Sequence, residues 1–220
     1  MDRLSAPLTR LLVFAKAPVP GRVKTRLAGV LGTRGAARLY RVLLLRTLAM
    51  ATATALGPVE LWCAPDSRHG FFSACRRAYG VRLCRQRSGD LGARMAQALR
   101  RTLAAGDSAL LIGGDCVSLS GAELRAAAAH LAGGADAVLG PAADGGYVLI
   151  GLRRPCRRLF EGIAWGTPQV LAATRRRLHR LGVNWSELAP GWDLDTPADL
   201  RRWRRLQVDS ASASPKASVV

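Results

Sequence analysis

Short apolar runs alternate with longer amphipathic segments along almost the whole chain. Residues 11–15 and 109–112 are continuous apolar runs that predict buried strands, and 59–63, 81–85, 135–140 and 146–152 predict four more strands. Segments with helical periodicity lie between them, at 36–50, 71–78, 91–103, 120–131, 167–182 and 196–206. This alternation is typical of βαβ units, so we expect one α/β, Rossmann-like domain over residues 8–206, its mostly parallel sheet flanked by helices. Residues 207–220 lack periodicity and predict a flexible C-terminal tail.

Three of the predicted helices begin with capping signals. Ser120 and Glu123 have the spacing of a capping box. Thr167 and Thr196 each precede a proline, which combines an N-cap residue with a favoured first-turn residue. We therefore expect helices to begin at these three points.

Composition excludes several classes of protein. The 220 residues are 49% hydrophobic and 22% charged, as in ordinary globular chains. No apolar stretch reaches the roughly 20 residues of a membrane span, and the first residues do not resemble a signal peptide, so we expect a cytoplasmic protein without a membrane span. The five cysteines have no metal-ligand or disulfide-framework spacing, which predicts buried thiols. No Gly-x-Ser-x-Gly motif occurs, which argues against a hydrolase triad.

The charge is unusual. Lysine and arginine number 33 against 15 acidic residues, for a formal net charge of +18. Such a charge attracts anions, which include both nucleic acids and small phosphorylated substrates. Arginine clusters at 153–158, 175–177 and 201–205 lack interleaved aromatic residues and any known binding motif. We therefore expect no specific nucleic-acid partner, with a basic nucleic-acid-binding module kept as an alternative.

A basic loop with a glycine follows the first predicted strand. In open α/β sheets, ligands bind at the carboxyl ends of strands, and glycine lets the backbone approach a phosphate closely. Val23 precedes Lys24, so the loop is not a P-loop of the ATPase type; a surface turn stiffened by prolines is the alternative. The candidate nucleotide- or phosphate-binding residues are Lys16, Gly21, Arg22, Lys24, Thr25 and Arg26.

Three aspartates are candidate metal ligands. Asp115 follows the buried strand at 109–112, and Asp193 and Asp195 alternate on an extended segment, which puts both on one side of the chain. Carboxylates in such places can hold a divalent cation that bridges phosphate oxygens. The alternatives are an Asx-turn at Asp115 and a helix-dipole role for Asp195.

Two further segments could contact an acceptor or a base. Asp144 lies between two predicted strands and could position an acceptor or act as its base, although a hairpin turn needs the same residues. The segment around residue 90 could serve binding or simply begin the next helix. The candidate acceptor or base contacts are Gly89, Asp90, Arg94, Gly145 and Gly146.

Taken in order, segments 14–27, 113–119, 144–151 and 193–200 resemble the glycosyltransferase-A-like branch of the nucleotide-diphospho-sugar transferases. More narrowly, the chain is similar to short bacterial glycosyltransferases associated with radical-SAM or selenodomain proteins or linked to arsenosugars. It is more distantly similar to the molybdenum cofactor and phospholactate guanylyltransferases. The resemblance implies a nucleotide on the first loop and Mg²⁺ or Mn²⁺ at Asp115, with one of Asp193 and Asp195. Gly114 and Ala143 depart from the group, where Thr and Asp are usual.

The sequence therefore predicts a metal-dependent transferase, with a nucleotide sugar as donor and a small molecule as acceptor. Its catalytic candidates are Lys24 on the diphosphate, Asp115 on the metal and Asp144 at the acceptor. The alternative is nucleotidylyl transfer from a nucleoside triphosphate to a phosphorylated or acidic acceptor, with release of pyrophosphate. A non-catalytic member of the group is a third alternative, beside the nucleic-acid-binding module.

Overall fold

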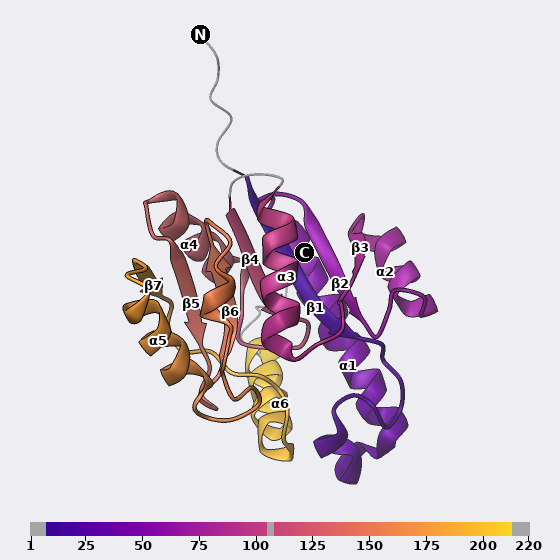
Figure 1. Cartoon of the computed structure of the whole chain (residues 1–220). Helices are drawn as coiled ribbons and strands as arrows, with labels where there is room; N and C mark the ends of the chain where they lie inside the picture. The colour runs from indigo at the N-terminus through magenta and orange to yellow at the C-terminus, as the bar shows by residue number, and fades with distance from the viewer. Residues whose placement is uncertain (1–7, 105–107, 213–220) are drawn as a thin grey trace, which may run out of the picture.

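A seven-stranded sheet runs through the molecule in the order β3-β2-β1-β4-β6-β5-β7 (Figure 1). The computed structural model describes residues 8–104 and 108–212. Among the described strands, β6 alone runs antiparallel to its neighbours, β4 and β5. The predicted α/β fold with a mostly parallel sheet is confirmed. The strands are β1 Thr9–Lys16, β2 Val59–Ala64, β3 Arg82–Arg85, β4 Ser108–Gly113, β5 Ala137–Pro141, β6 Tyr147–Leu152 and β7 Trp185–Glu187.

Helices cover both faces of this sheet. On one face α1, α2 and α4 pack against Leu11 and Val13 of β1, whereas on the other α3 and α5 share a core with Leu12, because successive strand residues point to opposite faces. Figure 1 shows α3 in front of the sheet, and α6 at the end toward which β1 points. None of the helices within the described residues is long and apolar enough to span a membrane. The helices are α1 Ala28–Ala53, α2 Gly70–Tyr79, α3 Leu91–Leu103, α4 Gly121–Ala132, α5 Val170–Arg180 and α6 Pro197–Ser212, with short 3₁₀ turns η1 Thr25–Leu27 and η2 Arg157–Leu159.

Two of the three capping predictions are confirmed. Ser120 and Glu123 form the capping box of α4, and the Thr196 hydroxyl accepts from the Asp199 backbone N–H at the start of α6. The prediction for Thr167 is wrong, since α5 begins at Val170 and the Thr167 hydroxyl instead donates to the Ala164 carbonyl at 2.8 Å.

The end of the chain also differs from the prediction. Helix α6 continues to Ser212, so the first six residues of the predicted tail, 207–212, are helical. Arginines and leucine carry the helical pattern up to residue 206, and the Gln-Val-Asp-Ser-Ala-Ser segment that follows has no apolar face, which is why the sequence pattern ends earlier than the helix. The rest of the predicted tail, 213–220, lies outside the described residues.

Strand β7 was not predicted. It has only three residues, which is too short for a two-residue alternation to be recognised. It pairs in parallel with β5, and Glu187 at its end forms a two-point ion pair with Arg175 of α5, at 2.8 and 2.6 Å. The pair ties the last strand of the sheet to the helix that covers it.

We expect this ion pair to stabilise the protein at neutral pH and to lose that effect in acid. The hydrogen bonds from Arg175 hold the pKa of Glu187 below its ordinary value. A lowered pKa in the folded state contributes stability above the unfolded pKa, and this is lost as the pH falls through the folded pKa. Glu187→Gln should therefore cost at most about 1 kcal/mol at pH 7, since the pair is partly exposed, and less at pH 3. Thermal unfolding at both pH values checks this; an equal loss at both would contradict it.

The chain changes direction across the sheet between β1 and β4. From β1 the chain proceeds to β2 and β3 on one side, whereas β4 leads to β6, β5 and β7 on the other. The loops after β1 and β4 therefore diverge, and in open α/β sheets such a switch point is where ligands bind. The following site lies there.

Candidate functional site

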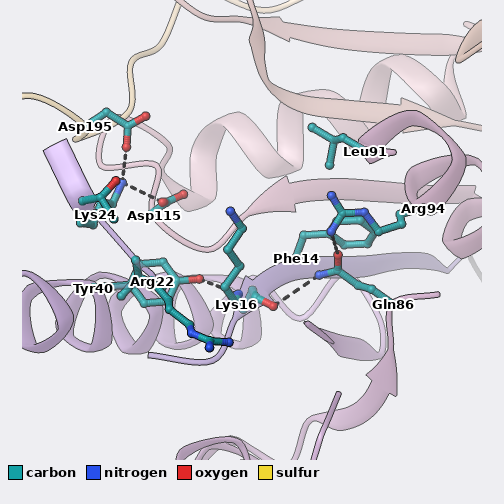
Figure 2. A pocket seen from close by; sticks show the side chains of 13 residues that line it. Phe14, Lys16, Arg22, Lys24, Tyr40, Gln86, Leu91, Arg94, Asp115 and Asp195 are labelled. Carbon is teal, nitrogen blue, oxygen red and sulfur yellow. Dashed lines mark hydrogen bonds and ion pairs between the residues drawn. The ribbon is translucent and has the colours of Figure 1, made fainter. Parts of the chain in front are cut away.

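A pocket of about 350 Å³ opens at the carboxyl ends of β1 and β4 (Figure 2). Its walls come from the end of β1, the loop before η1, the start of α3 and the segments after β3 and β4. Asp195, just before α6, closes one side. The lining residues are Phe14, Ala15, Lys16, Arg22, Val23, Lys24, Thr25, Tyr40, Gln86, Leu91, Arg94, Asp115 and Asp195.

One end of this pocket holds a lysine between two carboxylates. The ammonium of Lys24 lies 2.7 Å from Asp115 Oδ2 and 2.6 Å from Asp195 Oδ1. The Lys24 side chain is only 2% exposed, whereas Asp115 and Asp195 keep 29% and 48% of theirs exposed. Figure 2 shows the three side chains converging from three separate segments. The basic loop and two of the predicted metal ligands therefore meet at one point.

The backbone of Lys24 is held in an uncommon conformation. Its φ of 48° and ψ of 42° are left-handed, which costs about 1–2 kcal/mol for a residue other than glycine. Lys24 lies at the start of η1, with its side chain directed inward at the two aspartates. Burial opposes its positive charge, but Asp115 and Asp195 outweigh burial and raise the pKa of Lys24 above the ordinary lysine value. Lys24 is therefore a fixed, charged group.

Asp193 lies beside this group with one carboxylate oxygen buried. Its backbone pairs with Cys116 beside Asp115, and its Oδ1 is buried without a hydrogen-bond partner in the described part of the chain. Burial, and then the charges of Asp115 and Asp195, raise its pKa to about 7, although Lys24 opposes this. Lys24 pairs with Asp115 and Asp195, and these two carboxylates stay accessible, whereas burial favours the neutral form of Asp193.

The other end of the pocket is built on Gln86, which follows β3. Its side-chain NH₂ donates to the carbonyls of Trp62, at 2.7 Å, and Ala15, at 3.3 Å, so it fastens the ends of β1 and β2 together. Its side-chain oxygen accepts from Arg94 Nη1 at 3.2 Å. Gln86 thereby orients Arg94, whose remaining guanidinium N–H groups can donate to a ligand in the pocket.

Two exposed cations lie between these ends. Lys16 and Arg22 both line the pocket, and Figure 2 shows the Lys16 side chain extending into it. The Tyr40 hydroxyl accepts from the Lys16 backbone N–H at 2.9 Å and so fixes the end of β1. An anion in the pocket could pair with Lys16 and Arg22, which are exposed. The ammonium of Lys24, by contrast, already pairs with Asp115 and Asp195.

A second pocket of about 440 Å³ adjoins the first, and both are lined by Phe14, Leu91 and Asp195. It extends over β4 and β6 toward the start of α5. Asp144 and Arg26 contribute charged side chains to it, and Tyr147 and Trp165 contribute aromatic walls. A ligand that spans the shared residues would reach both pockets.

The residues predicted from sequence fall into three groups: those that line the first pocket, those that line the second, and those that line neither. The first pocket is lined by Lys16, Arg22, Lys24, Thr25, Arg94, Asp115 and Asp195. The second is lined by Arg26, Asp144, Gly146 and again Asp195. Gly21, Gly89, Asp90, Gly145 and Asp193 line neither of the two.

Two residues of the last group have structural roles. Asp90 Oδ1 accepts from the Ala93 N–H at 2.7 Å and caps α3, which is the helix-start role that the sequence left open. The Gly145 carbonyl accepts from the Leu171 N–H at 2.8 Å, which joins the Asp144 loop to α5. Neither is placed to contact an acceptor in these two pockets.

The two departures from the family pattern do not alter the pocket walls, since Gly114 and Ala143 line neither pocket. A Cβ at position 114 would lie 2.8 Å from Leu44 Cδ1 and 3.2 Å from the Phe14 carbonyl oxygen. A side chain at position 114 would therefore require Leu44 of α1 to shift.

Phe14, Tyr40 and Gln86 were not among the sequence candidates. Gln86 follows a predicted strand directly, so the rule that ligands bind at carboxyl ends of strands could have selected it. Tyr40 and Phe14 carry no such signal, because an aromatic residue on an apolar helix face or in a buried strand has the pattern of the core.

The fold matches those of the glycosyltransferase-A-like and nucleotidyltransferase-like α/β proteins, as predicted. The family model for uncharacterised proteins conserved in bacteria (DUF2064) matches residues 47–167, and the chain belongs to this family. No curated protein matches the sequence.

Three solved structures are similar. A proposed nucleotide-diphospho-sugar transferase from Desulfovibrio desulfuricans G20 is 32% identical, with a TM-score of 0.83 over 92% of this chain and 89% of that one. A nucleotidyl transferase from Methanothermobacter thermautotrophicus is 19% identical, with a TM-score of 0.65 over 92% and 99%. Rv0371c from Mycobacterium tuberculosis H37Rv, in complex with manganese, is 19% identical, with a TM-score of 0.52 over 89% and 97%. The first likeness supports the predicted superfamily, and the other two show the shared fold.

Proposed function

We propose that this protein is a transferase that takes a nucleotide sugar in the first pocket and passes the sugar to a small acceptor in the second. The observation that carries the proposal is Lys24, held between Asp115 and Asp195 at the switch point of the sheet. The name of the D. desulfuricans relative supports the donor class. The narrower likeness to glycosyltransferases associated with radical-SAM or selenodomain proteins, or linked to arsenosugars, is part of the proposal.

A divalent cation is part of the proposed site. No group of three or more His, Cys, Asp or Glu side chains within residues 8–104 and 108–212 is arranged to hold a metal ion by itself. Mg²⁺, however, is commonly held by one or two carboxylates plus substrate phosphates. Asp115 and Asp195 are both accessible, and the buried Oδ1 of Asp193 beside them lacks a hydrogen-bond partner within the described residues. The donor set fits Mg²⁺ or Mn²⁺, and the manganese complex of Rv0371c supports this choice.

The pocket suggests how the donor lies. Its diphosphate would bind near Lys16 and Arg22, with Asp115 and Asp195 holding the cation that neutralises it. The base would face Gln86 and Arg94 at the opposite end. The sugar would then point toward the residues that the two pockets share.

In the proposed reaction, an acceptor oxygen forms a bond to the anomeric carbon of the sugar. The bond from that carbon to the phosphate oxygen breaks, and the nucleoside diphosphate leaves with the electron pair. The acceptor proton passes to the Asp144 carboxylate, which is exposed in the second pocket. Lys16, Arg22 and Lys24 stabilise the charge that develops on the diphosphate, and the bound cation supplies the same stabilisation.

Nucleotidylyl transfer is the second candidate, favoured by the likeness to the M. thermautotrophicus nucleotidyl transferase. In that reaction the same cations would bind a triphosphate, and the acceptor would attack the α-phosphate with loss of pyrophosphate. The two reactions share the first pocket and differ in their leaving group.

The leaving group therefore tests the proposal. The protein should be incubated with nucleotide sugars and, separately, with nucleoside triphosphates, with and without Mn²⁺, and with water as the surrogate acceptor. We expect slow, Mn²⁺-dependent release of nucleoside diphosphate from at least one nucleotide sugar. Release of pyrophosphate from a triphosphate, with every nucleotide sugar left intact, would reverse the ranking.

A further inference from the structure

The second pocket is apolar over most of its wall. Phe14 lies near the end of β1, Leu111 on β4 and Val148 on β6, and Met95 of α3 and Val170 of α5 also line the pocket. All except Phe14 are buried, so these side chains present a fixed surface. Polyhydroxylated ligands lose hydrogen bonds to water against such a wall, which costs affinity.

Trp165 forms the outer side of the same pocket. Its ring lies 6.3 Å from that of Tyr147, edge to face, and 6.4 Å from that of Phe160, stacked. A Cβ on Gly92 of α3 would lie only 2.4 Å from Trp165 Nε1, so the indole occupies space that a side chain on α3 would otherwise fill. The indole is wedged among Gly92, Phe160 and Tyr147, which makes the aromatic wall a built feature.

The charged groups of this pocket are few and mostly negative. Asp144 and Asp195 are carboxylates, and Arg26 is the only basic residue that lines it. Asp144 Oδ1 accepts from the Gly146 N–H at 2.9 Å, which orients the carboxylate, and Oδ2 makes no hydrogen bond within the described part of the chain. Asp144 is thus set to accept one hydrogen bond from a ligand.

We propose that the acceptor is a neutral alcohol with an apolar, ring-containing body. Its body packs between Trp165 and Val148, and its hydroxyl donates to Asp144 beside the residues that both pockets share. This inference rests on the proposed transferase function and specifies its acceptor. A phosphorylated or carboxylated acceptor meets two carboxylates and one arginine here, which disfavours it.

Binding of small probes to the full-length protein tests this inference. The probes are 2-naphthylmethanol, the anionic 2-naphthoate, and glucose, with affinities measured by ligand-observed NMR. We expect 2-naphthylmethanol to bind at least tenfold more tightly than either of the others. Trp165→Ala should weaken 2-naphthylmethanol at least tenfold, whereas Trp185→Ala, which removes a half-buried tryptophan that lines neither pocket, should change it less than twofold.

The inference is overturned if 2-naphthoate or glucose binds as tightly as the alcohol, or if the two tryptophan variants behave alike. Thermal unfolding of both variants confirms that each remains folded. Binding of UDP and GDP with Mn²⁺ is titrated on the same samples to test the first pocket separately. If the wild-type protein binds a nucleotide but does not prefer the alcohol, only the inference about the acceptor is overturned. If the wild-type protein binds neither nucleotide, the proposed function is overturned as well.

Discussion

Replacing Lys24 with methionine is expected to reduce turnover of the nucleotide sugar by about a hundredfold to a thousandfold, the usual cost of one charge-stabilising contact. Lys24 is the one side chain that touches both Asp115 and Asp195, at 2.7 and 2.6 Å. Methionine keeps the length and apolar stem of lysine but leaves the two carboxylates facing each other without a counter-charge. Donor and cation would then bind to a site that is no longer organised.

Arg46→Met is the matched control for this variant. Arg46 is exposed on α1 and lines neither pocket, so the change removes one positive charge from the molecule without altering the site. Initial rates of nucleoside diphosphate release should fall for Lys24→Met only, while thermal unfolding shows both variants to be folded. A rate within threefold of wild type for a folded Lys24→Met would rule out the role given to this loop.

Asp115→Asn should have the second largest effect. The amide is isosteric with the carboxylate but carries no charge, so it binds a divalent cation poorly. Loss of a residue that hydrogen-bonds to a metal ligand typically weakens metal affinity about tenfold to a hundredfold. Loss of Asp115, as a direct ligand, should weaken the apparent Mn²⁺ affinity by at least as much. Turnover at a fixed low Mn²⁺ concentration should fall by at least the same factor, with partial recovery as Mn²⁺ is raised.

The control for this variant is Asp136→Asn. Asp136 precedes β5, accepts a hydrogen bond from the Asn184 N–H and lies outside both pockets. Titration of Mn²⁺ into the reaction at constant donor concentration separates the two cases. If Asp115→Asn and Asp136→Asn gave the same Mn²⁺ dependence, Asp115 would not be a ligand.

The architecture and the centre of the site could be predicted because both depend on local patterns. Continuous apolar runs specify buried strands, and the carboxyl ends of parallel strands meet at one edge of the sheet. That rule was sufficient to expect Lys24 near Asp115, although 91 positions separate them in the sequence. Asp195 was selected by its alternation with Asp193 on an extended segment, and it lies directly before the confirmed N-cap Thr196.

Features that depend on three-dimensional packing were not predictable in the same way. The start of α5 is fixed by contacts of the 164–171 segment with the Asp144 loop, not by the Thr167-Pro168 signal. The role of Gln86 depends on the spacing of the β1 and β2 carbonyls that its side chain joins. Burial also decides which aspartate is unusual: Asp193 and Asp195 are two positions apart, and the structure buries Oδ1 of Asp193, which raises the pKa of that carboxyl.

A crystal structure of the protein with Mn²⁺ and either UDP or GDP tests the central claim most directly. We expect an anomalous manganese peak at about 2.0–2.3 Å from an Asp115 oxygen, an Asp195 oxygen and a diphosphate oxygen, with the base against Gln86 and Arg94. Density for the nucleotide outside the first pocket, or a manganese peak remote from both aspartates, would contradict the account.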